Sequence, residues 1–135
     1  MMVMTAKVDF KKIAIVGIAL IAAIVALILI FTGGMSVDPD DLTPTAIRQL
    51  GADIITHGVP SQPGNMTLVA YLGDIPILGI PGAAISLPTT IFDVLLPQVF
   101  AGQRITKEEL LNLAEGGLCQ MCKTCHWPNC TFGRY

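Results

Sequence analysis

A run of 19 residues without a charged side chain, from Ile13 to Phe31, is the strongest constraint on the fold of this 135-residue chain. The run consists almost entirely of Ile, Ala, Val and Leu, and as a helix it would be roughly 28 Å long, close to the hydrocarbon thickness of a bilayer. It is too long for the apolar core of a cleaved signal peptide, and the TGGMS that follows is a poor cleavage site. We therefore expect residues 1–31 to form an N-terminal hydrophobic helix that crosses a membrane once.

Charged residues on either side of the run predict its orientation. Lysines precede the run and aspartates follow it, at Lys7, Lys11 and Lys12 and at Asp38, Asp40 and Asp41. The positive-inside rule then places the N-terminus in the cytoplasm and the rest of the chain outside. An alternative stays open, because the β-branched residues 26–31 lead directly into a Gly-Gly turn and resemble a buried parallel strand. In that case the chain would be cytoplasmic.

The composition beyond the run is that of one small domain with an appendage. The chain is 53% hydrophobic and 13% charged, with a formal net charge of −2. No basic cluster exists beyond the three N-terminal lysines, so the sequence offers no electrostatic footprint for nucleic acid. Nucleic-acid binding is therefore excluded from the function classes considered.

The middle of the chain alternates helix and strand signals. Thr43-Pro44 and Gly51 bracket a short helix, because proline suits its start and glycine the position after its end. A short strand is expected at residues 52–59. Two apolar runs, 66–72 and 75–80, are separated by Gly73-Asp74, which predicts a hairpin.

Two further helices are expected before the C-terminus. Ser86 is a candidate cap for a helix that reaches Phe100. Thr106 and Glu109 form a capping box that starts a helix ended by Gly116-Gly117. Short strands alternating with helices predict an α/β layer architecture.

Three stretches of the chain resemble one known family. They are IFTGGMSVDPDDLTP (30–44), PSQPGNMTLVAYLGDIPILGIPG (60–82) and FDVLLPQVFAGQRIT (92–106). Together they resemble the C-terminal half of the molybdopterin-binding domain of molybdenum cofactor biosynthesis proteins, and the Gly-Gly-Leu-Cys tail resembles the anaerobe-type members. The resemblance covers about residues 26–135. It implies an α/β fold, here a truncated three-layer sandwich, and molybdopterin as the cofactor.

The resemblance also implies a pocket for the pterin and its phosphate. The residues that match the family's pocket lie in the turn after the first strand, in the segment after it and in a later Pro-Gly loop, namely Thr32, Gly33, Gly34, Ser36, Asp41, Pro81 and Gly82. Glycines in such a turn let the backbone approach an anion closely. Without the family match, Gly33-Gly34 would indicate only a strand-to-loop turn.

The chain departs from the family pattern in two respects. Nothing before residue 26 matches the family's N-terminal half, and Ala83 stands where the family often has asparagine. A half-domain would leave a sheet edge uncovered, so we expect it to be completed by the apolar N-terminal segment, by a partner chain or by a second copy of this chain. With His57 and His126 as its only histidines, the chain offers no recognisable catalytic residue.

All four cysteines lie within twelve positions of the C-terminal segment 116–135. The spacing is Cys119-x2-Cys122-x2-Cys125-x4-Cys130, which suits zinc or an iron–sulfur cluster, although the bacterial ferredoxin pattern has three residues before its last cysteine. Cys125 followed by His126 also fits the C-x-x-C-H pattern of haem attachment, the less favoured ligand. Disulfides remain open and would need an oxidising compartment.

Three functional interpretations follow for the segments 1–31, 32–115 and 116–135. The first is a partial molybdopterin-binding domain that binds or handles the cofactor. The second is a membrane-anchored metal or redox carrier that uses the cysteines. The third is a truncated fragment without function.

Overall fold

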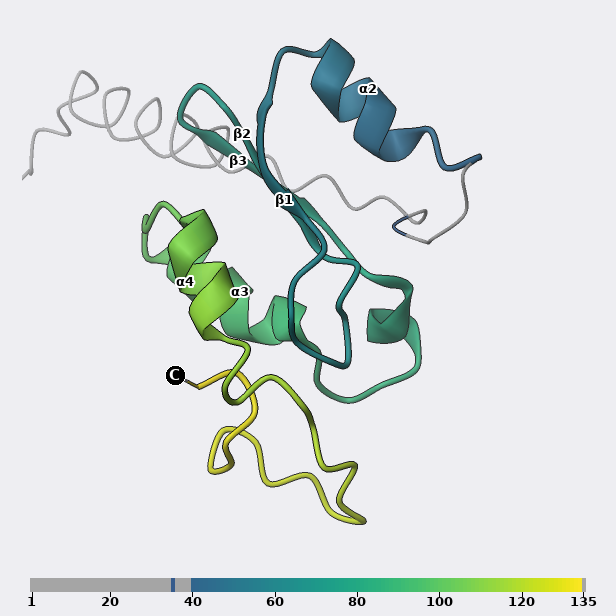
Figure 1. Cartoon of the computed structure of the whole chain (residues 1–135), viewed down its shortest axis with the longest axis vertical. Helices are drawn as coiled ribbons and strands as arrows, with labels where there is room; N and C mark the ends of the chain where they lie inside the picture. The colour runs from purple at the N-terminus through teal and green to yellow at the C-terminus, as the bar shows by residue number, and fades with distance from the viewer. Residues whose placement is uncertain (1–34, 36–39, 135) are drawn as a thin grey trace, which may run out of the picture.

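The computed structural model describes Met35 and residues 40–134 (Figure 1). The predicted membrane helix, its alternative strand at 26–31 and four of the expected pocket residues lie outside the described residues, these four being Thr32, Gly33, Gly34 and Ser36. Within the described ranges, no helix combines the length and the apolar character needed to cross a membrane.

Three strands form one antiparallel sheet in the order β1-β2-β3, with bounds β1 Asp53–His57, β2 Leu68–Leu72 and β3 Ile75–Gly79. Leu72 pairs with Ile75, so Gly73 and Asp74 form the two-residue hairpin loop that the sequence predicted. Gly73 has a φ of 61°, a conformation that glycine adopts without strain.

Both faces of the sheet are covered by helices (Figure 1). Leu68 and Ala70 of β2 pack with Ile47 of α2 (Thr43–Gln49) on one face. The alternate residues Val69 and Tyr71 face the other core, which contains residues of α3 (Ile91–Phe100) and α4 (Lys107–Asn112). This mixed arrangement of helices and sheet is consistent with the predicted α/β class.

The helix α2 begins and ends close to the predicted positions. Thr43 is its first residue rather than its cap, because the N-cap position is taken by Leu42, and Pro44 lies in the first turn. Gly51 follows the helix with a φ of 78°, which a side chain would strain. The proline and glycine signals therefore marked this helix correctly.

The expected helix from Ser86 to Phe100 is wrong at its start. A 3₁₀ turn, η1 (Gly82–Ile85), ends at Ser86, and α3 begins only at Ile91. Thr90 is the true N-cap, since its backbone N–H donates to the Asp93 carboxylate at 2.8 Å in a capping box. The Thr90–Asp93 capping box therefore sets the start of α3.

The helix α4 has the predicted cap but a shorter body. Thr106 and Glu109 form the reciprocal capping box, and hydrogen bonds from the backbone and then the hydroxyl of Thr106 lower the pKa of Glu109. The helix ends at Asn112, four residues before the Gly116-Gly117 pair that was expected to end it.

The connection between α3 and α4 is fixed to the sheet at Tyr71. The phenol oxygen of Tyr71 accepts a hydrogen bond from the buried backbone N–H of Ile105 at 2.7 Å. Arg104 lies over the same ring, with its guanidinium carbon 4.0 Å from the ring centre. The C-terminal helix and the tail after it are therefore positioned by the sheet itself.

Candidate functional site

The loop after β3 meets the segment that follows the predicted glycine turn. Met35 and Pro81 form an isolated parallel bridge, although 46 positions separate them along the chain. Met35 is buried, and a Cβ on Gly79 would lie 2.7 Å from its Sδ and Cε atoms. Glycine at the end of β3 therefore makes room for Met35. Met35 thus lies beside the Pro81-Gly82 loop.

Pro81 and Gly82 differ sharply in their surroundings. Pro81 is fully buried and has an extended backbone at the start of η1, with φ −68° and ψ 146°. Gly82 is exposed, and nothing among the described residues lies within 4 Å of the position that a Cβ would occupy. The packed proline therefore positions a backbone that leaves open space beside it, as close approach of a ligand requires.

Asp41 has a structural contact at the start of α2. Its Oδ1 accepts a hydrogen bond from the backbone N–H of Thr43 at 3.1 Å, and the residue is half-buried. This is the geometry of an acidic residue that stabilises free N–H groups at a helix start. Asp41 therefore has a role in the fold besides the pocket role that the resemblance implies.

The second candidate region is the segment 116–134, called the tail loop here, whose two ends lie side by side. Gly116 and Gly133 are joined by a backbone hydrogen bond of 3.0 Å from the N–H of Gly133. A parallel bridge joins Leu118 to Gln62, with the N–H of Cys119 donating to the Gln62 carbonyl at 2.9 Å. The ends of the loop are therefore fixed to each other and to the body of the molecule.

Close packing at the glycine pair allows this docking. A Cβ on Gly117 would lie 2.5 Å from the carbonyl oxygen of Pro60, and one on Gly116 would collide with the carbonyl oxygens of Thr131 and Arg134. Phe132, at the far end of the loop, is buried in the core with α3 and α4. Gly116, Gly117 and Phe132 together attach the tail loop to the rest of the molecule.

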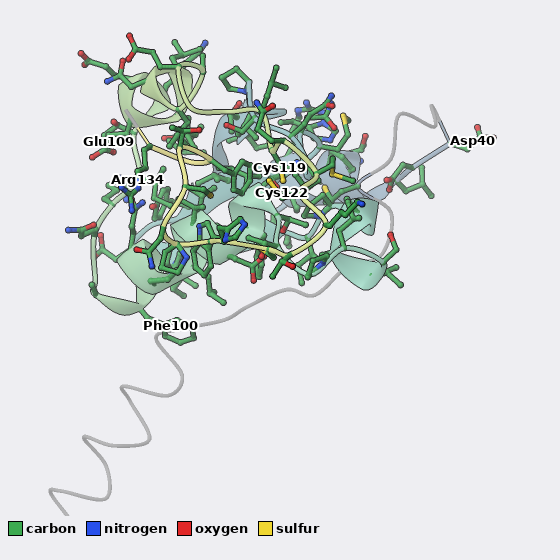
Figure 2. The ribbon with its side chains drawn as sticks, turned by 90° about the horizontal axis from the view of Figure 1, so that it is seen from below. Asp40, Phe100, Glu109, Cys119, Cys122 and Arg134 are labelled. Atoms are coloured by element: carbon green, nitrogen blue, oxygen red, sulfur yellow. The ribbon has the colours of Figure 1, made fainter. Side chains whose placement is uncertain are left out.

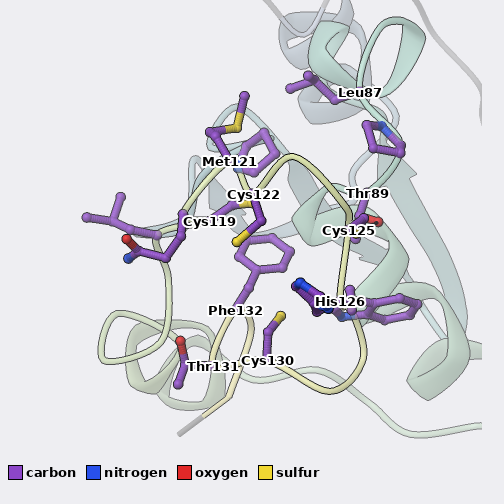
Figure 3. Close-up of a pocket in the computed structure, with 15 residues that line it drawn as sticks. Leu87, Thr89, Cys119, Met121, Cys122, Cys125, His126, Cys130, Thr131 and Phe132 are labelled. Atoms are coloured by element: carbon purple, nitrogen blue, oxygen red, sulfur yellow. Dashed lines mark hydrogen bonds between the residues drawn. The ribbon is translucent and has the colours of Figure 1, made fainter.

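All four cysteines and His126 line one cavity of about 180 Å³ (Figure 3). Cys119 and Cys130, at the ends of the loop, are half-buried and pack against the core, whereas Cys122 and Cys125 are exposed. All four are free thiols in this structure, so it forms none of the disulfides that the sequence left open. The cysteine-rich segment therefore folds around a single space, as Figure 3 shows.

The wall of this cavity opposite the loop had no signal in the sequence. It is made by residues before α3, including Leu87, Pro88 and Thr89. The hydroxyl oxygen of Thr89 lies 3.7 Å from the Cys125 sulfur, within hydrogen-bonding distance. Trp127 and Phe132 both line the cavity, but Phe132 is buried in the core while Trp127 stays exposed.

The expected metal site is not preassembled. In the part of the chain that the structure describes, no three His, Cys, Asp or Glu side chains are grouped so that they could hold a metal ion. Zinc, iron–sulfur and haem at the cysteines therefore receive no direct support from the coordinates. The tail loop also lies apart from Asp40 at the start of the described chain, as Figure 2 shows for Cys119 and Cys122.

The chain belongs to a family described as "Probable molybdopterin binding domain", whose model matches residues 11–101. The match includes the apolar run and starts well before residue 26, where the resemblance was expected to begin. It ends before α4, so the tail loop lies outside it. The family that the sequence motifs indicated is therefore confirmed.

Two curated proteins are similar to part of the chain. It is 41% identical over 54 residues to "Molybdopterin molybdenumtransferase" of Bacillus subtilis (strain 168). It is 39% identical over the same length to "Putative molybdopterin biosynthesis protein MJ0666" of Methanocaldococcus jannaschii. Each alignment covers 40% of this chain and only 13% of the relative. No solved structure matches the chain.

Proposed function

We propose that this chain binds molybdopterin, or the molybdenum cofactor, at the junction of the Met35 segment and the Pro81-Gly82 loop. The observation that carries the proposal is the parallel bridge between Met35 and Pro81. It supports a pocket shared by the loop after β3 and the turn at residues 32–36, two segments that the family resemblance implies. Ligands of open α/β sheets bind outside the carboxyl ends of strands, and the Pro81-Gly82 loop follows the carboxyl end of β3.

The chemistry of the loop suits a phosphate-bearing pterin. Gly82 leaves open space beside its backbone, and the turn at 32–36 contributes Gly33 and Gly34, whose lack of a Cβ lets N–H groups approach an anion. Ser36 and Thr32 would add hydroxyl donors to the phosphate. Asp41 would accept from the pterin's N–H groups while it also supports α2.

The proposed role is binding or handling of the cofactor. Because the chain covers 13% of each relative, completion of the domain by a partner chain or a second copy is part of the proposal. The family match favours neither of the other two interpretations, the membrane-anchored carrier and the fragment without function. Since it includes residues 13–31, we also infer that the apolar run is part of the family's domain.

The test measures the binding of molybdopterin, released anaerobically from a molybdoenzyme, to the full chain by equilibrium dialysis. Gly82→Val places a branched side chain in the open space, and we expect at least a tenfold loss of affinity with an unchanged circular dichroism spectrum. Ala114→Val adds a similar branched side chain at an exposed position after α4 and serves as the matched control. Equal affinity of the two variants would remove the Pro81-Gly82 loop from the site.

Asp41→Asn separates the two roles of this residue. The amide oxygen still accepts from Thr43, so α2 keeps its start, but the charge and one acceptor are lost. We expect weaker binding at unchanged stability. Unaltered affinity would assign Asp41 to the fold alone, and absence of binding by the folded wild-type chain would overturn the proposed function.

A further inference from the structure

The tail loop gathers all of the chain's cysteines around one space. Four cysteines and one of the two histidines line the cavity of about 180 Å³. A cavity of about 150 Å³ can hold a ligand the size of benzene, so this one has room for a compact group of several atoms. Thiolates are the preferred ligands of zinc, copper(I) and iron–sulfur clusters.

We propose that the tail loop is the site of a polynuclear iron–sulfur cluster held by Cys119, Cys122, Cys125 and Cys130. The argument rests on the cavity that all four cysteines line. Around a single tetrahedral zinc ion with Zn–S bonds of about 2.3 Å, the sulfurs would lie about 3.8 Å apart. No such group of three ligands exists among the described residues, although all four cysteines line the same cavity.

A cluster has a larger core than a single ion. In a four-iron cluster with four cysteine ligands, each cysteine sulfur binds a different iron atom, and the inorganic core fills the space between them. The cysteines must then line a space large enough for the core, and all four line the cavity of about 180 Å³. The half-buried Cys119 and Cys130 are fixed at the ends of the loop, and the exposed Cys122 and Cys125 lie between them.

The charges of the segment favour the same ligand. Residues 116–135 contain Lys123 and Arg134 and no acidic side chain, a formal charge of +2. Four thiolates around a four-iron core of charge +2 would carry −2, which these cations offset. The surrounding wall is largely apolar, with Leu87, Pro88 and Trp127, so uncompensated thiolates would be costly there.

The backbone of the loop is strained beside one of the ligands. Met121 has a φ of 51°, the one left-handed non-glycine residue in the described part of the chain. This conformation turns the chain between Cys119 and Cys122, so that both line the cavity. Strain of this kind persists where the surroundings hold it, and it clusters at functional sites.

The hydroxyl of Thr89 completes the surroundings of the proposed cluster. It lies 3.7 Å from the Cys125 sulfur and would donate to that sulfur as a ligated thiolate. Hydrogen bonds to ligand sulfurs are one determinant of cluster potential. The body of the molecule thus contributes to the site as well as the loop.

The experiment is anaerobic reconstitution of the full chain with sulfide and equal amounts of ferrous and ferric iron, which together give a four-iron core of charge +2 without a further oxidant. We expect about four iron and four acid-labile sulfide per chain, with broad visible absorption from sulfide-to-iron charge transfer. The double variant Cys122→Ala with Cys125→Ala should lose the iron, the acid-labile sulfide and the visible absorption. Because both side chains are exposed, its circular dichroism spectrum should match that of the wild type.

Two controls make the result specific to the four cysteines. Thr124→Ala changes an exposed side chain between two ligands, and His126→Gln removes the imidazole from the cavity; both should keep the wild-type iron content. Iron retained by the double variant would overturn the proposal. So would stoichiometric zinc without labile sulfide, or the absence of any metal in the folded wild-type chain. The proposal is independent of pterin binding, since these readouts need no pterin.

Discussion

The body of the molecule, residues 40–115, and the tail loop are stabilised in different ways. The body has a sheet with an apolar core on each face, and side chains such as Leu68 and Leu78 are fully buried. The tail loop contains no helix or strand longer than the single Leu118 bridge, and its residues from 120 to 129 are exposed. Its shape is therefore fixed at its two ends, while its middle depends on the cavity that it surrounds.

The functions proposed for the two regions therefore rest on different kinds of evidence. The body lies largely within the family match, so its proposed function follows from a shared ligand site. The tail loop lies outside that match, so its chemistry has to be argued from its own thiols, charges and packing. The contrast is testable, because the two regions meet at only a few residues.

Phe132→Ala is expected to have the largest effect on the free energy of unfolding, because Phe132 joins the tail loop to the core of the body. Phe132 belongs to the tail loop, yet it is only 4% exposed and packs in the core of the body. Truncating a buried phenylalanine costs about 3–5 kcal/mol. Urea unfolding followed by circular dichroism should show that loss of unfolding free energy.

Phe100→Ala is the matched control for this truncation. Phe100 ends α3 and is 63% exposed, so its removal should change the unfolding free energy by less than about 0.5 kcal/mol. Similar results for the two variants would mean that the tail loop adds nothing to the core.

Gly117→Ala should separate the tail loop from the body. The added Cβ would lie 2.5 Å from the Pro60 carbonyl oxygen and 2.8 Å from that of Leu113, both backbone atoms that cannot move alone. Overpacking of this kind costs about 1–3 kcal/mol. Limited proteolysis within residues 118–130 should accelerate more than cleavage of the body.

Gly82→Ala provides the control for that substitution. It makes the same chemical change at a glycine with open space around its Cβ position and no positive φ. Its stability should stay within about 0.5 kcal/mol of the wild type. Equal proteolysis of both variants would show that the glycine pair does not attach the loop.

The sequence predicted the elements whose signals are local. The Gly73-Asp74 hairpin and the Thr106 capping box occur as expected, because each depends on residues a few positions apart. The start of α3 differs from the predicted Ser86, although the sequence also contains the Thr90–Asp93 capping box at the true start. A local signal was therefore missed there, not overridden.

The candidate sites required contacts that no local pattern contains. The family resemblance supplied Pro81 and Gly82, but the bridge to Met35 appears only in the structure. The spacing of the cysteines predicted a shared site, whereas the opposite wall with Thr89 depends on packing between segments more than 30 residues apart.

The smallest expected effect lies at the start of α4, which joins the body to the tail loop. Thr106→Ala removes the side-chain half of the capping box and should cost about 1 kcal/mol. The same truncation at the exposed Thr124 is the control and should be neutral.

Glu109 adds a pH dependence, because its pKa in the folded state is lowered by hydrogen bonds from Thr106. The stability that the ionised Glu109 contributes is complete above the ordinary carboxyl pKa and is lost as the pH falls through the lowered pKa. Glu109→Gln should therefore flatten the acid limb of the stability profile, and an unchanged limb would mean that this helix start does not couple to folding.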